Sequence, residues 1–219
     1  MMSLIDSLIE EGWLKTPKII EAFRTIKRVD FMPAQVLHGK IWAGEPENMG
    51  DLAELNEALP IGYGQTISQP LVVAFMLEQL NPQPGEKILD VGSGSGWTSA
   101  LLGEIVGPKG KVFAIEVIPE LKEFGEKNVS KYNFIKKGHV QFICADGSKG
   151  YPKEALFDKI LCSAAAQKKI PPVWKEQLKI GGRIVTPIGS SIWLLIKKSE
   201  DEFEEIEYPG FAFVPLITK

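Results

Sequence analysis

The feature that most constrains the fold is a regular alternation of short apolar runs with longer segments between residues 87 and 189. Each apolar run has the length of a buried strand, and the segments between the runs have the length of a helix. Such an alternation favours parallel strands joined by right-handed helical crossovers. Strands are predicted at 87–92, 111–117, 140–146, 157–165 and 183–189, and helices at 97–107, 119–132 and 172–179.

Both ends of the chain add elements to this core. Residues 3–11 and 17–28 carry apolar side chains at helical spacing, and a further helix is predicted over 70–80. Two apolar runs, 191–198 and 210–217, are joined without a helical segment, which predicts an antiparallel hairpin. We therefore expect an α/β fold, Rossmann-like and doubly wound, with a mostly parallel sheet, an antiparallel edge hairpin and extra N-terminal helices.

Composition argues against several classes of protein. The net charge of −3 and the lack of a long basic tract give no reason to expect a nucleic-acid partner. No apolar run reaches the roughly 20 residues that cross a bilayer, and the N-terminus lacks the apolar core of a signal peptide. We expect a cytoplasmic protein without a membrane partner.

Cys144 and Cys162 lie in apolar runs and are expected to be buried thiols. His38 and His139 lack neighbours at ligand spacing, so no metal site is expected.

A glycine-rich loop, LDVGSGSGW, follows the first strand of the alternating region and opens a helix. Open α/β sheets bind ligands at this place, and Gly92, Gly94 and Gly96 let the backbone approach a ligand closely. The spacing is G-x-G-x-G, and Trp97 stands where the dinucleotide fingerprint needs a glycine. This difference disfavours a nicotinamide oxidoreductase.

Acidic side chains end three successive strands. Asp90 comes just before the glycines, where an anion would repel a pyrophosphate and favour a ligand that carries positive charge. Glu116 ends the next strand and can accept hydrogen bonds from ribose hydroxyls. Asp146, followed by Gly147, ends the third strand and would face an adenine ring. S-adenosyl-L-methionine has an ammonium, a sulfonium and no phosphate, so this pattern favours it over NAD. Each acid could instead cap the next helix or face solvent.

The stretch PIGYGQTISQP at residues 60–70 places small polar side chains directly before an apolar helix. Ser68 is well placed to cap that helix, whose first turn would hold Pro70. A cap does not account for Gln65 and Thr66. The stretch is therefore also interpreted as one lip of a binding site.

These motifs together resemble the protein-L-isoaspartate (D-aspartate) O-methyltransferase family. The resemblance covers most of residues 20–219. Its most specific part is the T-I-S run before a proline and an apolar helix, whereas the glycine loop marks methyltransferases generally. The stretches that carry it are PIGYGQTISQP (60–70), LDVGSGSG (89–96), AIEV (114–117), CADGSKGYP (144–152), FDKILCSAAA (157–166), IPPVWKEQLKIGGRIVTPIG (170–189) and FVPL (213–216).

The resemblance implies one class I methyltransferase domain over 1–219, with N-terminal helices and lip in 1–69 and a cofactor core in 70–219. It implies transfer of a methyl group from S-adenosyl-L-methionine to the free α-carboxylate of L-isoaspartyl, and D-aspartyl, residues in damaged proteins, which starts their repair through a succinimide. The catalytic residue would be Ser68. The loop, the acids and the resemblance together give the expected cofactor-binding residues, Asp90, Gly92, Ser93, Gly94, Gly96, Glu116, Val117, Asp146 and Gly147. The expected substrate-binding residues are Gln65, Thr66, Ile67, Ser68, Val214 and Pro215.

This chemistry requires no strong base, because the carboxylate is an anion near neutral pH and the methyl donor is a cation. Ser68 is expected to orient the carboxylate as a hydrogen-bond donor in a site sheltered from water.

Two alternatives stay open: a methyltransferase of this fold with another carboxylate or small-molecule acceptor, and a non-catalytic relative. The first is favoured by residues 38–56, which diverge from the family pattern, and disfavoured by the intact T-I-S run of the lip. The second is disfavoured by the presence of Asp90, Glu116 and Ser68. Chain length and the short tail suggest a monomer.

Overall fold

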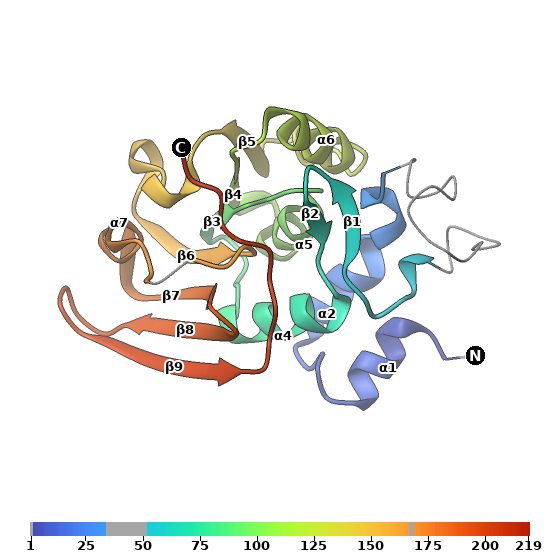
Figure 1. The fold of residues 1–219 in the computed structure, drawn as a ribbon, viewed down its shortest axis with the longest axis horizontal. Coiled ribbons are helices and arrows are strands. Elements are labelled where there is room, and N and C mark those ends of the chain that lie inside the picture. Colours follow the sequence, from blue (N-terminus) through green and yellow to red (C-terminus); the bar gives the residue numbers. More distant parts are fainter. Residues whose placement is uncertain (1, 34–51, 167–168) are drawn as a thin grey trace.

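The core of the molecule is a seven-stranded sheet (Figure 1). The structure is a computed structural model that describes residues 2–33, 52–166 and 169–219. The strand order is β5-β4-β3-β6-β7-β8-β9. Strands β3 to β7 pair in parallel, and β8 and β9 are antiparallel. The bounds are β3 Lys87–Val91, β4 Lys111–Glu116, β5 Val140–Cys144, β6 Phe157–Cys162, β7 Leu178–Ile188, β8 Ser191–Lys197 and β9 Phe203–Pro209. The predicted fold class is confirmed.

Two hydrophobic cores lie on opposite faces of this sheet, because successive side chains of a strand point to opposite faces. Ile88 of β3 packs in the larger core, with α1, α2, α4, α5 and α6, whereas Leu89 packs in the smaller core with α7. The helices are α1 Leu4–Glu10, α2 Pro17–Thr25, α4 Pro70–Leu80, α5 Trp97–Val106, α6 Pro119–Ser130 and α7 Pro172–Glu176. Short 3₁₀ turns occur at η1 Arg28–Phe31, η3 Gly107–Lys109, η4 Gly147–Lys149 and η5 Pro152–Glu154.

Helix α4 begins in a different way from the predicted one. Pro70 occupies its first turn as expected. The N-cap residue is Gln69, and its side chain makes no hydrogen bond to the helix. The amide of Leu71 instead donates to Asn56 Oδ1 at 3.0 Å. The predicted cap by Ser68 is therefore wrong, because a residue from outside the helix satisfies this first-turn amide.

The C-terminal hairpin is confirmed, but with a different second strand. Strand β8 pairs with β9, Phe203–Pro209, and the predicted strand at 210–217 is wrong. That segment makes two backbone hydrogen bonds to the loop after β6: Ala165 N donates to Val214 O, and Leu216 N donates to Ala165 O, both at 2.8 Å. Residues 211–217 therefore cross the carboxyl end of the sheet, as the red trace in Figure 1 shows.

Two further predictions from local patterns are wrong. Helix α7 ends at Glu176 and not at residue 179, because Leu178 is already fully buried and pairs with Phe157 of β6. Cys144 is exposed, whereas Cys162 is buried as expected. Cys144 ends β5, an edge strand whose two faces are unequally covered.

Residues 38–51 of the divergent segment, and His38 with them, lie outside the described residues. In the parts that the structure describes, no helix is long and apolar enough to cross a membrane. Within those same ranges, no group of three or more His, Cys, Asp and Glu side chains is arranged to hold a metal ion.

Candidate active site

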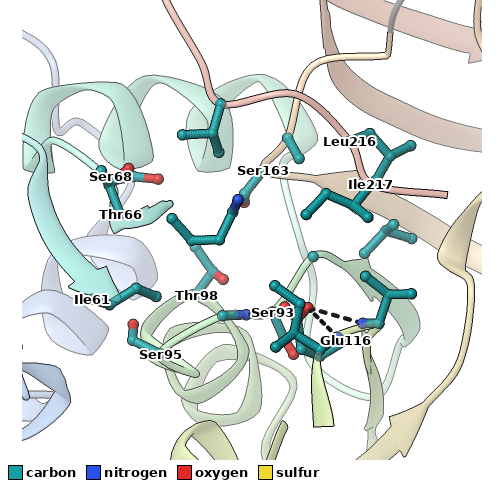
Figure 2. A pocket seen from close by; sticks show the side chains of 18 of the residues that line it. Ile61, Thr66, Ser68, Ser93, Ser95, Thr98, Glu116, Ser163, Leu216 and Ile217 are labelled. Atoms are coloured by element: carbon teal, nitrogen blue, oxygen red, sulfur yellow. Dashed lines mark hydrogen bonds between the residues drawn. The ribbon is translucent and has the colours of Figure 1, made fainter. Parts of the chain in front are cut away.

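A cleft opens at the carboxyl ends of the central strands. Strand β3 lies between β4 and β6, so the chain order reverses at this point of the sheet. Open α/β sheets bind their ligands at such a switch point. The cleft encloses about 710 Å³, including its open mouth. Its walls come from the glycine loop, from the ends of β4 and β6, from a small hairpin at 59–67 and from residues 214–217 (Figure 2).

The glycine loop presents its backbone to the cleft. Gly92 and Gly94 line it with φ values of +73° and +49°, conformations that favour glycine. The loop is held by Gly92 N and Ser93 N, which donate to Ile115 O at 2.9 and 3.1 Å. Gly96 has another role, because it is the N-cap residue of α5 with φ +85°, and a Cβ there would lie 2.8 Å from Gly125 O of α6. Gly96 does not line the cleft.

Glu116 ties the end of β4 to the glycine loop. Its carboxylate is buried, 6% exposed, and lines the cleft. Oε2 accepts from Gly94 N at 2.9 Å, and Oε1 accepts from Val117 N at 2.9 Å and Ile118 N at 3.0 Å. A carboxylate has roughly four acceptor sites. Three are used here, which leaves capacity for a further donor from a ligand.

Asp90 lies beneath the cleft and not on its surface. It is fully buried, and Oδ2 accepts from Ser99 Oγ at 2.6 Å and Thr98 Oγ1 at 3.1 Å. Burial raises the pKa of Asp90 to about 6, the two hydroxyl donors oppose that rise, and the charge of Glu116 adds to it. Thr98 itself lines the cleft. Asp90 is therefore connected to the cleft by its hydrogen bond with Thr98.

Asp146 also lies outside the lining of the cleft, although Gly147 belongs to it. Oδ1 accepts from Ser148 N at 3.0 Å and from Ser148 Oγ at 2.6 Å, and Oδ2 accepts from Lys219 N at 3.0 Å. Burial alone would raise the pKa of Asp146, but these donors, with Lys149, hold it below its ordinary value. The carboxylate thus caps η4 and binds the C-terminal segment.

The hairpin of β1, Leu59–Gly62, and β2, Gln65–Ile67, forms the opposite wall together with Ser68. Gln65, Thr66, Ile67 and Ser68 all line the cleft, as do Val214 and Pro215. In Figure 2, Thr66 and Ser68 stand on one side of the opening, and Leu216 and Ile217 stand on the other. The predicted substrate residues are therefore brought together from positions about 150 apart in the chain.

The donor set of the cleft fits a cationic cofactor without phosphates. Among the described lining residues, Glu116 is the one charged side chain, and no Lys, Arg or His is present. Within the same part of the chain, the buried Ser93 Oγ has no hydrogen-bond partner and remains available to a ligand. Ile115, Val117 and Leu216 provide apolar surface for a ring.

Sequence reasoning missed about half of the lining. The unpredicted residues are Ile61, Val91, Ser95, Trp97, Thr98, Ile115, Ile118, Ser163, Ala164, Leu216 and Ile217. Ser163 and Ala164 follow β6, a strand end beside the switch point, so topology could have indicated them. Ile61 carries no local signal, because it reaches the cleft through the hairpin.

The switch-point cleft, the glycine loop and the acid at the end of β4 define the class of protein: the fold and site are those of S-adenosyl-L-methionine-dependent methyltransferases. The model of the family "Protein-L-isoaspartate(D-aspartate) O-methyltransferase" matches residues 1–219. The chain belongs to this family.

Individual relatives agree with this assignment. The chain is 39% identical to a protein-L-isoaspartate O-methyltransferase of Methanopyrus kandleri, over 98% of this chain and 89% of the relative. It is 42% identical to one of Aeropyrum pernix, over 99% and 78%.

Two solved structures share the fold. One, titled protein-L-isoaspartate O-methyltransferase, has a TM-score of 0.81 and 25% identity, and the match covers 97% of this chain and 64% of that chain. The other, of a Plasmodium falciparum protein in complex with S-adenosyl-L-homocysteine, has a TM-score of 0.80 and 20% identity, over 99% and 97%.

Proposed function

We propose that the chain transfers a methyl group from S-adenosyl-L-methionine to the free α-carboxylate of L-isoaspartyl residues, and of D-aspartyl residues, in damaged proteins. The products would be a carboxyl methyl ester and S-adenosyl-L-homocysteine. The ester would close to a succinimide, which reopens partly to normal aspartate. The observation that carries the proposal is a single cleft in which the Thr66–Ser68 lip faces the glycine loop and Glu116.

Bound S-adenosyl-L-methionine supplies a methyl group on a positively charged sulfur. The backbone of Gly92 to Gly94 and the free Ser93 hydroxyl would hold the amino-acid part of the cofactor. The remaining acceptor capacity of Glu116 would bind the ribose, and Val117 and Gly147 would border the adenine. The carboxylates of Glu116 and, from beneath, Asp90 would favour the positive charge.

On the substrate side, no group of the chain has to remove a proton, because the α-carboxylate is ionised near neutral pH. The Ser68 hydroxyl would donate a hydrogen bond to this carboxylate and orient one of its oxygens, while Gln65 and Thr66 would border it. Val214 and Pro215 would present a backbone edge to the peptide. The apolar side chain of Ile67 in the lip would help to exclude water.

We further propose that residues 1–219 form one domain and that the protein acts as a monomer in the cytoplasm. Its substrates would be proteins, and it would bind no nucleic acid. Lining residues come from both 1–69 and 70–219, which supports one functional unit. The net charge of −3 supports the absence of a nucleic-acid partner.

The test uses methyl transfer from radiolabelled S-adenosyl-L-methionine to two synthetic peptides that differ only in Asp or isoAsp. We expect base-labile label on the isoAsp peptide alone. Label on neither peptide, while S-adenosyl-L-homocysteine still binds, would remove the substrate assignment. Equal label on both peptides would indicate a different acceptor.

A Ser68→Ala variant tests the role of the lip. We expect kcat/KM for the isoAsp peptide to fall at least about tenfold, because one hydrogen bond to a charged group is lost. The Kd of S-adenosyl-L-homocysteine should stay the same. Ser130→Ala is the matched control, because the Ser130 hydroxyl is exposed on α6, where it donates to Glu126 O. Unchanged kcat/KM in Ser68→Ala would exclude Ser68 from the reaction.

A further inference from the structure

Arg28 of η1 is a buried cation that the proposed reaction does not use. It is 6% exposed, and its guanidinium donates to four backbone carbonyls. Nη1 donates to Leu55 O at 2.9 Å and to Ala53 O at 3.3 Å. Nη2 donates to Glu57 O at 2.6 Å and to Ser68 O at 3.3 Å.

These carbonyls lie at the two ends of the lip hairpin. Residues 53–57 lead into β1, and Ser68 directly follows β2. One planar guanidinium therefore holds both the entry and the exit of the hairpin that carries Thr66. The four N–H groups of Nη1 and Nη2 match these four carbonyls, whereas a Lys ammonium has three donors on a flexible stem.

The same side chain also contacts the cofactor side of the cleft. The guanidinium carbon of Arg28 lies 5.5 Å from the centre of the Trp97 ring, a cation–π distance. Trp97 is the first residue of α5 and lines the cleft. Arg28 thus connects the base of the substrate lip to the wall formed by the glycine loop and α5.

The position is electrostatically costly. Burial lowers the pKa of Arg28 to about 10, and the charge of Glu54 offsets part of this effect. The side chain is therefore still charged near neutral pH. A buried charge needs well-aligned hydrogen bonds to be tolerated, and here the carbonyls of the lip supply them.

We propose that Arg28 is a positioning residue for methyl transfer, which sets the lip and the Ser68 backbone against the Trp97 wall of the cofactor cleft. The inference rests on the proposed function and deepens it. If it is correct, loss of the guanidinium fork lowers kcat/KM for the peptide substrate more than it weakens the binding of the cofactor.

The test compares Arg28→Lys, which keeps the charge without the fork, and Arg28→Gln, which keeps a planar donor without the charge. We expect kcat/KM for the isoAsp peptide to fall at least about tenfold in Arg28→Lys. The Kd of S-adenosyl-L-homocysteine should stay within about threefold. Arg24→Lys is the control, because Arg24 is 60% exposed and faces Asp6. It should behave as wild type.

Three results would overturn the proposal. One is kcat/KM within threefold of wild type in both Arg28 variants. Another is a proportional loss of cofactor binding and peptide activity, which would indicate a general structural role. The third is failure of both variants to fold, which would assign Arg28 to stability alone.

Amide hydrogen exchange separates this inference from the proposed function. If wild type methylates no isoAsp peptide, the proposed function fails, but exchange over residues 59–68 still decides on Arg28. Faster exchange there in Arg28→Lys, with cofactor binding retained, supports positioning of the lip. Unchanged exchange overturns it.

Discussion

At the scale of single residues, Asp90 links stability to pH. Its pKa is raised to about 6 in the folded protein from an ordinary 3.8, mainly by burial. The folded state therefore binds the proton more tightly than the unfolded state. This group contributes stability below pH 4, and that contribution is lost as the pH rises through 6.

We expect Asp90→Asn to remove this dependence. Relative to wild type, the free energy of unfolding of the variant should rise by about 2 kcal/mol between pH 4 and pH 7, since one pKa unit corresponds to about 1.4 kcal/mol and the group is already partly ionised in the unfolded chain at pH 4. Urea denaturation at several pH values measures this difference.

Asp158→Asn is the control with the opposite sign. Burial alone would raise the pKa of Asp158, but the donors Lys179 Nζ and Lys87 N hold it below its ordinary value. That variant should lose stability at pH 7, and the loss should vanish at low pH. Parallel pH profiles of Asp90→Asn and wild type would contradict the raised pKa.

At the scale of elements, Glu78 of α4 fixes the start of α2. Its Oε1 accepts from Lys15 N at 2.8 Å and from Thr16 N at 2.9 Å, and its Oε2 accepts from Thr16 Oγ1 at 2.7 Å. Thr16 is the N-cap of α2 but makes no cap bond with its own side chain. A side chain of another helix therefore anchors the N-cap residue of α2.

We expect Glu78→Ala to lower the free energy of unfolding by about 1–3 kcal/mol, because three donors lose a charged acceptor. Amide exchange should rise over residues 16–25. Glu21→Ala, in α2 itself, removes a 62% exposed carboxylate that faces Lys18 at 3.6 Å. It should change stability by less than about 1 kcal/mol. Equal effects of the two variants would show that the contact between α4 and α2 does not depend on Glu78.

At the scale of the whole molecule, the cleft joins segments that are distant in the chain. Residues 61–68 and 214–217 line it together with the loop after β3. We expect saturating S-adenosyl-L-homocysteine to slow amide exchange in all three segments. The β8–β9 hairpin contributes no lining residue and should be unaffected. Protection confined to the glycine loop and the end of β4 would contradict closure of the cleft by the other two segments.

Much of the fold was predictable because strand and helix periods are local properties of a sequence. The strands at 87–92 and 111–117 and the helix at 97–107 agree with β3, β4 and α5 to within a residue. The errors have tertiary causes. Leu178 pairs with Phe157, which ends α7 early.

The alternation of the core, the glycine loop, the acid at the end of β4 and the family can all be recognised in the amino-acid sequence. The position of Asp90 beneath the cleft, the cap of α4 by Asn56 and the contacts of Arg28 with the lip become visible only in the folded molecule. The difference lies in the range of the interactions. Side-chain periodicity and glycine torsion act within a few residues, whereas the contact between Arg28 and Ser68 spans 40 positions and exists only once the layers have packed.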